Sequence, residues 1–174
     1  IDHLTAQGEK VGLVAVHLYR PFSAKHFLAA VPATAKTIAV LDRTKEPGAN
    51  GEPLYLDVKE CFYGKENAPV IVGGRYGLGS NDTTPAQILA VYENLALPEP
   101  KNQFTLGIVD DVTFTSLPQK EEVAMGGEGM FEAKFYGLGA DGTVGANKNS
   151  VKIIGDNTNK HCQAYFSYDS KKSG

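Results

Sequence analysis

The stretch FYGLGADGTVGANKNSVKIIGDN, residues 135–157, combines an aromatic start, a glycine-rich turn and a helical pattern. The turn, residues 137–142, matches G-x-G-x-x-G, and a helix is predicted to follow it and to end at Gly155. Apolar residues 130–136 predict a strand before the turn, and residues 164–168 predict a strand after the helix. Strand, glycine turn, helix and strand is the order of a βαβ unit that binds anions at its helix N-terminus.

Candidate anion ligands surround this predicted unit. Lys148 lies far enough into the helix for its ammonium group to lean back toward a phosphate, and Asn147 adds a neutral donor. Hydroxyl and ammonium groups follow the second strand. The candidate cofactor-binding residues are Gly137, Gly139, Gly142, Thr143, Asn147, Lys148, Ser170, Lys171 and Lys172.

The residues around these candidates do not decide which ligand would bind. Asp169 stands where NAD-binding folds keep an acid for ribose, whereas Lys171 and Lys172 suit a phosphorylated ribose better. Asp141 is a complication, because a carboxylate at the helix start competes with a bound anion. Alternatively, the glycines only allow the helix and strand to pack closely.

Residues 1–118 alternate between apolar runs and helical patterns. The run VGLVAVHLY, residues 11–19, predicts a strand buried in a parallel sheet. Further strands are predicted at residues 37–41, 70–72, 104–109 and 112–117. The alternation predicts an α/β domain whose parallel sheet is covered by helices on both faces. Its sheet core is expected to contain Val14, Val16, Ile38, Val40, Ile71 and Val72.

Three helices are predicted between these strands. Ser23 can cap the first, and Pro53 suits the first turn of the second. Thr84 and Gln87 form a capping box at the start of the third. The charged and glycine-rich residues 119–129 then predict a linker.

Composition excludes several functions. The net charge of −3 argues against a general nucleic-acid binder, and no apolar run reaches the ~18–20 residues of a membrane helix. Cys61 and Cys162 lack C-x-x-C spacing and indicate reduced thiols without a zinc or iron–sulfur site. Asp110 and Asp111 indicate a polar turn, because adjacent strand residues point to opposite faces. We predict no catalytic and no metal-binding residue.

Two charged positions follow predicted strands, where α/β proteins place ligands. We interpret Asp42 and Arg43 as an ion pair that fixes the loop after them. Arg75 is interpreted as a residue of a solvated glycine-flanked loop.

Longer motifs resemble the pyruvate:ferredoxin (flavodoxin) oxidoreductases. The motifs are LYRPF (18–22), AVLDRTKEPGANGEPLY (39–55), GGRYGLGS (73–80), GIVDDVTF (107–114), GLGADGTVGANKNSVKIIGDN (137–157) and YDSKKSG (168–174). The resemblance runs from about residue 11 to the end and implies an internal fragment of the single-chain form. It implies that residues 1–118 form a three-layer domain similar to the C-terminal domain of transketolases. Residues 130–174 would then begin a gamma-type, nucleotide-binding-like domain that contacts coenzyme A, with only its first βαβ unit present.

The resemblance also implies a function. The family oxidatively decarboxylates pyruvate on thiamine diphosphate with Mg²⁺, passes electrons through [4Fe–4S] clusters to ferredoxin or flavodoxin, and yields acetyl-CoA and CO₂. Its thiamine and cluster residues lie in other domains, so this segment alone is expected to be inactive. We expect it to supply interdomain and dimer framework and part of a coenzyme A site, in a homodimer of the cytoplasm or of an anaerobic organelle such as a hydrogenosome. A dinucleotide-binding module of a dehydrogenase and a purely structural docking domain are the alternatives.

Overall fold

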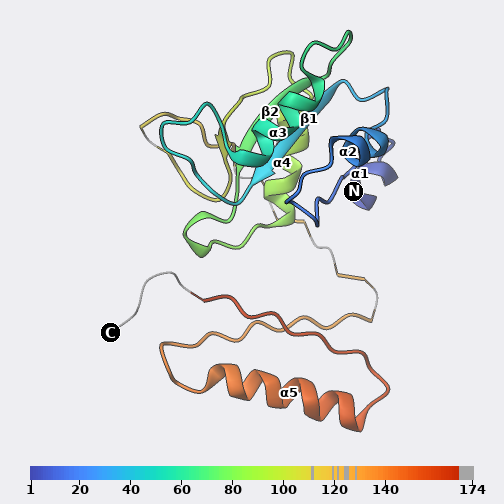
Figure 1. Ribbon diagram of the computed structural model, residues 1–174. Helices are drawn as coiled ribbons and strands as arrows, with labels where there is room; N and C mark the ends of the chain where they lie inside the picture. The colour runs from blue at the N-terminus through green and yellow to red at the C-terminus, as the bar shows by residue number, and fades with distance from the viewer. Residues whose placement is uncertain (111, 119, 121, 124–125, 128, 169–174) are drawn as a thin grey trace. The chain divides into compact units, whose positions relative to one another are not determined.

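Two units make up the chain, Ile1–Val123 and Ala124–Gly174, and each is described by itself (Figure 1). The computed structural model describes residues 1–110, 112–118, 120, 122–123, 126–127 and 129–168. Within these residues, no helix has the length and apolar character needed to cross a membrane.

A parallel sheet of three strands in the order β1-β2-β3 organises the first unit. Its strands are β1 (Thr37–Asp42), β2 (Val70–Arg75) and the short β3 (Phe104–Thr105). β1 and β2 pair along their whole length, ending with Asp42 opposite Arg75. The predicted α/β class and the strands at 37–41 and 70–72 are confirmed.

Helices precede and connect the strands. The first unit contains α1 (Asp2–Ala6), α2 (Ala24–Ala30), α3 (Pro53–Phe62), the 3₁₀ helix η1 (Leu78–Ser80) and α4 (Pro85–Leu95). Two predicted N-caps are confirmed. The Ser23 side chain accepts a hydrogen bond from the His26 N–H, and Thr84 and Gln87 form both hydrogen bonds of a capping box. These bonds satisfy N–H groups that the first helical turn leaves without a partner.

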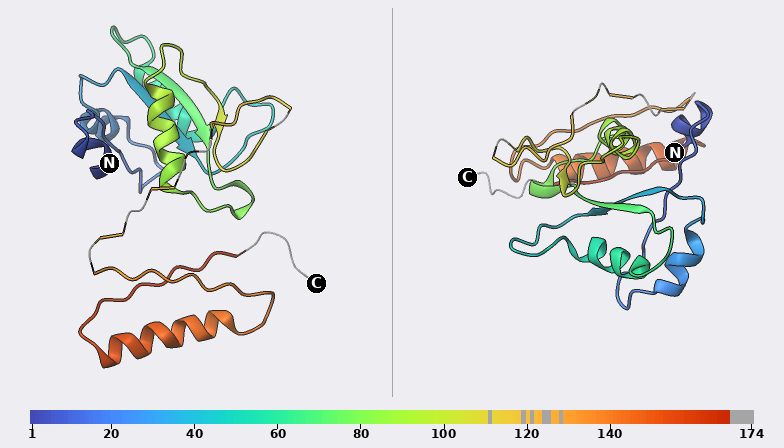
Figure 2. Two further views of the ribbon diagram at one scale, coloured as in Figure 1. Left: turned by 180° about the vertical axis from the view of Figure 1, so that it is seen from behind. Right: turned by 90° about the horizontal axis from the view of Figure 1, so that it is seen from above.

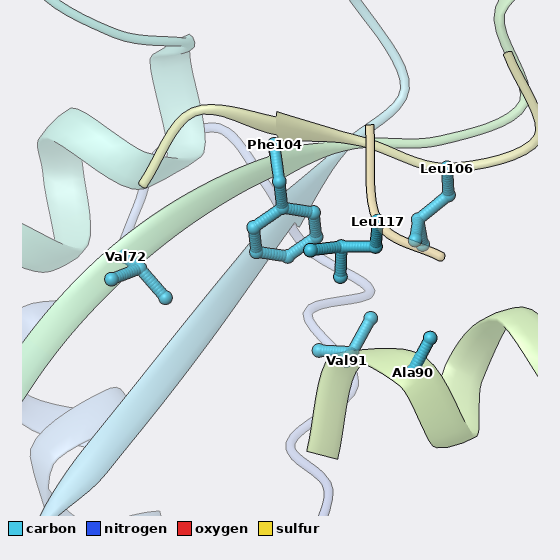
Figure 3. Packing of buried hydrophobic residues seen from close by; sticks show 6 residues of the cluster. All are labelled: Val72, Ala90, Val91, Phe104, Leu106 and Leu117. Atoms are coloured by element: carbon cyan, nitrogen blue, oxygen red, sulfur yellow. The ribbon is translucent and has the colours of Figure 1, made fainter. Parts of the chain in front are cut away.

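The core lies on both faces of the sheet, as alternation along a strand requires. One cluster joins Val72 of β2 to α4 through Ala90 and Val91, and it also contains Phe104, Leu106 and Leu117 (Figure 3). The second cluster joins Val40 of β1 to α2 and α3 through Phe27, Tyr55, Val58 and Cys61. Ala39, next to Val40 in β1, packs against the first cluster, and Ile71, next to Val72 in β2, packs against the second. The predicted coverage of both sheet faces is therefore confirmed.

The predicted strand at residues 11–19 is wrong. These residues are assigned to no strand, and Val14, expected in the sheet core, is exposed. An apolar run becomes a buried strand only when neighbouring strands satisfy its backbone. In the described part of the chain, no strand pairs with this run. The Tyr92 hydroxyl donates to the Gly12 carbonyl at 2.9 Å, and Arg20 donates to the Tyr19 carbonyl at 3.2 Å and to the Tyr19 hydroxyl at 2.8 Å.

The two strands predicted at 104–109 and 112–117 are also largely wrong. Only Phe104–Thr105 forms a strand, and Ser116 contributes a single bridge to Thr105. Gly107 turns the chain with φ = +72°, and the following residues fold around the Asp110 carboxylate instead of extending. Local turn chemistry therefore outweighs the apolar pattern here.

The second unit contains α5 (Thr143–Asn157), which lies beside two extended segments (Figures 1 and 2). The helix is confirmed, but it continues through Gly155, because a glycine near a helix end costs only about 1 kcal/mol. Neither flanking segment, 130–136 or 164–168, is a strand. The predicted βαβ unit therefore lacks both strands, and the gamma-type domain is not confirmed.

Candidate functional site

The backbone geometry of the turn at residues 137–142 explains why all three of its pattern positions are glycine. Gly139 and Gly142 have φ values of +61° and +85°, which residues with a side chain rarely adopt. At Gly137, an added Cβ would lie 2.7 Å from the Thr143 side chain and 2.9 Å from Asp141 Oδ1. The pattern G-x-G-x-x-G is therefore explained by the shape of the turn, whether or not an anion binds there.

Asp141 fills part of the site predicted for an anion. Its carboxylate accepts the backbone N–H groups of Leu138 and Thr143, each at 2.9 Å. Hydrogen bonds from the Thr143 side chain, and then from these backbone groups, hold the pKa of Asp141 below its usual value. This carboxylate therefore occupies two N–H groups of the turn, and its competition with a bound anion stays a prediction.

Donors nevertheless remain at the start of α5. Gly142 is the N-cap residue and has no side chain to accept the first N–H groups of the helix. Val144 and Gly145 occupy the second and third helical positions, where backbone N–H groups have no intrahelical acceptor. The helix dipole adds a partial positive charge at this end. An anion placed here would contact these two N–H groups while Asp141 keeps its own two.

Of the two predicted ligands on α5, Lys148 contacts the segment that follows the helix. Asn147 is half-buried, and Lys148 is exposed with its Nζ 5.5 Å from the centre of the Phe166 ring. The ammonium group therefore makes a cation–π contact with the segment that follows the helix. Gly137, Gly142 and Thr143 are brought together, whereas Ser170, Lys171 and Lys172, with Asp169, lie outside the described residues.

In the first unit, a row of polar residues crosses the sheet where its strands end. Asp42, Arg75 and Thr105 are in register across β1, β2 and β3, and Arg75 Nε donates to Glu52 Oε1 at 2.5 Å. Glu52 is 1% exposed, and its Oε2 is buried without a hydrogen-bond partner among the described residues. Arg75 also donates to the Gln103 carbonyl at 3.1 Å. The interpretation of Arg75 as a solvated loop residue is wrong.

Glu52 was missed by the sequence reasoning. It immediately precedes Pro53, so it occupies the N-cap position of α3, yet its side chain forms no cap hydrogen bond. Glutamate is not among the favoured N-cap residues. An unfavoured residue at a well-marked helix start was the available signal that this side chain serves another element.

The Asp42 carboxylate caps α3 from a distance. It accepts the N–H groups of Leu54 at 3.0 Å and Tyr55 at 3.1 Å. Burial raises the pKa of Asp42, and the two hydrogen bonds oppose that rise. The expected Asp42–Arg43 pair is wrong, because Arg43 Nε instead donates to the Gly77 carbonyl at 3.4 Å. The edge of the sheet is thus built to anchor α3.

Few described residues are candidates for metal binding or redox chemistry. Among the described residues, no group of three or more His, Cys, Asp or Glu side chains could hold a metal ion. Cys61 is buried, Cys162 is half-buried, and both are free. Asp110 accepts the N–H groups of Val112 and Thr113 at 3.0 Å each, which confirms its interpretation as part of a polar turn, whereas Asp111 lies outside the described residues.

The fold and these sites define an α/β domain with an internally anchored sheet edge, followed by a separate unit with a glycine turn and a helix. The sequence profile described as pyruvate:ferredoxin oxidoreductase core domain II matches residues 1–88. The chain belongs to this family.

Curated relatives match the entire chain. Identity is 62% over 175 residues with a pyruvate-flavodoxin oxidoreductase of Klebsiella pneumoniae and 59% over 174 residues with a pyruvate:ferredoxin oxidoreductase of Moorella thermoacetica. A probable pyruvate-flavodoxin oxidoreductase of Escherichia coli is 53% identical over 180 residues. The chain spans 15% of the length of each of these relatives.

Proposed function

We propose that this chain is a section of an enzyme that converts pyruvate and coenzyme A to acetyl-CoA and CO₂ and transfers electrons to ferredoxin or flavodoxin. The observation that carries the proposal is 62% identity, over the entire chain, to the pyruvate-flavodoxin oxidoreductase of K. pneumoniae. The electron acceptor is the partner of the whole enzyme, which we propose to be a homodimer of the cytoplasm.

The first unit serves this enzyme as framework. Its charged residues at the sheet edge are engaged internally: Glu52 binds Arg75, and Asp42 binds the N-terminus of α3. A [4Fe–4S] cluster takes four cysteine ligands, and the chain contains two cysteines. The clusters, thiamine diphosphate and Mg²⁺ therefore belong to other domains in this proposal, and the segment alone has no activity.

The second unit provides part of the coenzyme A site. Coenzyme A carries a diphosphate and a 3′-phosphate, which suit backbone N–H groups at a helix N-terminus and lysine ammonium groups. Backbone N–H groups are available at Val144 and Gly145 of α5, and Lys171 and Lys172 of the sequence supply the ammonium groups. The Thr143 hydroxyl group also lies beside the turn, where it donates to the Asp141 carboxylate.

A purely structural role for the second unit is the competing proposal, and Asp141 favours it. Its carboxylate already binds two N–H groups of the turn, so the glycines have a complete explanation without a ligand. A dehydrogenase-type dinucleotide module receives less support, because the strand that should precede the glycine turn is not formed by residues 130–136.

The reaction is tested with a chimera. The corresponding stretch of the K. pneumoniae relative is replaced by this chain, and pyruvate-dependent reduction of flavodoxin is measured with and without coenzyme A. We expect activity that requires both substrates. A chimera that elutes as the parent enzyme does, yet reduces no flavodoxin, would contradict the proposed function.

The coenzyme A role is tested by changing Lys171 and Lys172 to alanine in the same chimera. Charge-assisted hydrogen bonds contribute roughly 1.5–3 kcal/mol each when buried and less where solvent screens them, so the loss of two solvent-screened bonds should lower coenzyme A affinity by about one to two powers of ten, with pyruvate affinity unchanged. The matched control changes Lys152 and Lys160, two exposed lysines of the same unit, to alanine. Equal coenzyme A affinity in both double variants would favour the structural role.

A further inference from the structure

The loop between β3 and Leu117 is built around one carboxylate. Asp110 accepts the N–H groups of Val112 and Thr113 at 3.0 Å, the Thr115 hydroxyl at 2.8 Å and the Thr113 hydroxyl. Ser116 Oγ closes the base of the loop by donating to the Ile108 carbonyl at 2.6 Å. These bonds hold the described residues of the loop, 106–110 and 112–116, in one arrangement.

A lysine holds the other side of the loop. Lys101 Nζ donates to the carbonyl oxygens of Phe114 at 3.0 Å and Ser116 at 3.2 Å. Phe114 itself has φ = +53°, a left-handed conformation that costs a residue with a side chain roughly 1–2 kcal/mol. Strain of this kind persists where the surrounding structure enforces it and commonly marks a functional position.

The loop uses this rigid backbone to present apolar side chains to solvent. Val109, Val112 and Phe114, which we call the apolar tip, are 80%, 81% and 71% exposed. Asp110, the charged residue described in the loop, binds inside it, and Lys101, which precedes β3, binds the loop backbone. A preorganised apolar surface of this kind is typical of a protein–protein contact, because ordering costs have already been met.

We infer that the apolar tip packs into an apolar pocket on another part of the same polypeptide, outside these 174 residues. The chain spans 15% of the length of its relatives, so most of the protein surface that could cover the tip belongs to the same molecule. Permanent interfaces are more apolar than transient ones, whereas encounters with electron carriers are small and steered by charge. The tip fits the permanent kind. This inference rests on the chain being part of a longer polypeptide, and not on the reaction.

The experiment uses the full-length protein with Phe114→Cys and follows its modification by a maleimide, peptide by peptide, with mass spectrometry. Phe114 is 71% exposed within its own unit, so that unit alone gives little protection. We expect modification at least tenfold slower than in the same protein unfolded in urea. Tyr63→Cys, at an aromatic position 83% exposed at the end of α3, reports any general retardation. A smaller protection at position 114 would overturn the inference.

A second measurement identifies what covers the tip. A benzophenone maleimide attached at Val112→Cys is irradiated in the full-length protein, and the cross-linked peptide is sequenced. The inference requires an intramolecular adduct to a peptide outside residues 1–174. An adduct to a second copy, shown by mixing isotope-labelled and unlabelled protein, an adduct to the electron acceptor, or no adduct would overturn it. Neither measurement depends on pyruvate turnover, so the inference can fail while the proposed function stands.

Discussion

The two units of the chain use their apolar residues differently. In the first unit, Phe104 is completely buried between β2 and α4, and two clusters fill both faces of the sheet. In the described part of the second unit, α5 has no buried residue, and aromatic side chains such as Phe131 and Tyr165 are exposed. The first unit therefore derives its stability from its own core, whereas the described second unit has its apolar residues still available for contacts.

The carboxylate groups at the two sites differ in the same way, being buried at the sheet edge of the first unit and exposed at the glycine turn of the second. Glu52 and Asp42 are buried in the first unit and bind its own strands and helix. Asp141 of the second unit is exposed and binds only the turn beside it. In the proposed function, the first unit is therefore the framework, because its buried charges are engaged, and the second unit is where N–H groups remain for a ligand.

The largest difference between the units is expected from removing an aromatic ring. Phe104→Ala leaves a cavity in the first core and should destabilise it by about 3–5 kcal/mol. Phe131→Ala removes a ring that is 89% exposed and should change stability by less than about 0.5 kcal/mol. Urea unfolding of the full chain checks both, and similar losses for the two variants would show that the second unit has a core after all.

The buried ion pair gives the next largest effect. Arg75→Met leaves Glu52 charged and buried without its partner, which should cost about 3 kcal/mol. Adding Glu52→Gln should recover part of that loss, because the unpaired charge is removed. The exposed pair of Arg20 and Asp57 is the control, and Arg20→Met should cost much less, because solvent screens an exposed ion pair. Equal costs for Arg75→Met and Arg20→Met in urea unfolding would refute the framework role of the sheet edge.

Smaller effects of opposite sign are expected in the glycine region. Gly142→Ala introduces a side chain at φ = +85° and should destabilise the start of α5 by about 1 kcal/mol. Gly145→Ala meets no atom within 4 Å in the helix and should stabilise it by about 0.5–1 kcal/mol. Hydrogen exchange of the α5 amides measures both changes. If both variants shift exchange in the same direction, the turn geometry described for Gly142 is wrong.

The smallest effect concerns pH. Hydrogen bonds from the Thr113 side chain and its backbone N–H hold the pKa of Asp110 well below its usual range. The ionised carboxylate therefore stabilises the loop above the ordinary aspartate pKa, and this stabilisation decreases as the pH falls below about 4. Exchange of the Thr113 and Thr115 amides should lose protection in that window, and Asp110→Asn should abolish the pH dependence. A pH-independent exchange pattern in the unmodified protein would contradict this assignment.

Local signals in the sequence predicted α2, α3, α4 and α5, whereas α1 was not predicted. The capping box of Thr84 and Gln87 fixed the start of α4, and Pro53 fixed that of α3, because both depend on atoms a few residues apart. β1 and β2 were also predicted, because each apolar run finds a neighbouring strand. The run at residues 11–19 has an equally strong pattern but no such neighbour in the described chain. A strand needs a partner that its own residues cannot specify.

The candidate site was predicted less completely. The glycine turn and its helix were identified, and Asp141, which binds two N–H groups of the turn, was predicted to compete with an anion. The Glu52–Arg75 ion pair was not predicted, because its residues are 23 positions apart and meet only when the end of β2 lies beside the start of α3. The position of Lys148 over Phe166 likewise depends on how the chain returns along α5. Such contacts follow from tertiary structure and have no local pattern.

The division between a framework unit and a ligand-contacting unit is tested most directly by hydrogen exchange of the full-length protein with and without coenzyme A. The account predicts that coenzyme A slows exchange in peptides that cover residues 137–148, where N–H groups at the start of α5 remain available. Peptides that cover β1 and β2 should be unchanged, because Asp42 and Arg75 are already engaged there. Protection at the ends of β1 and β2, with none at residues 137–148, would contradict the account.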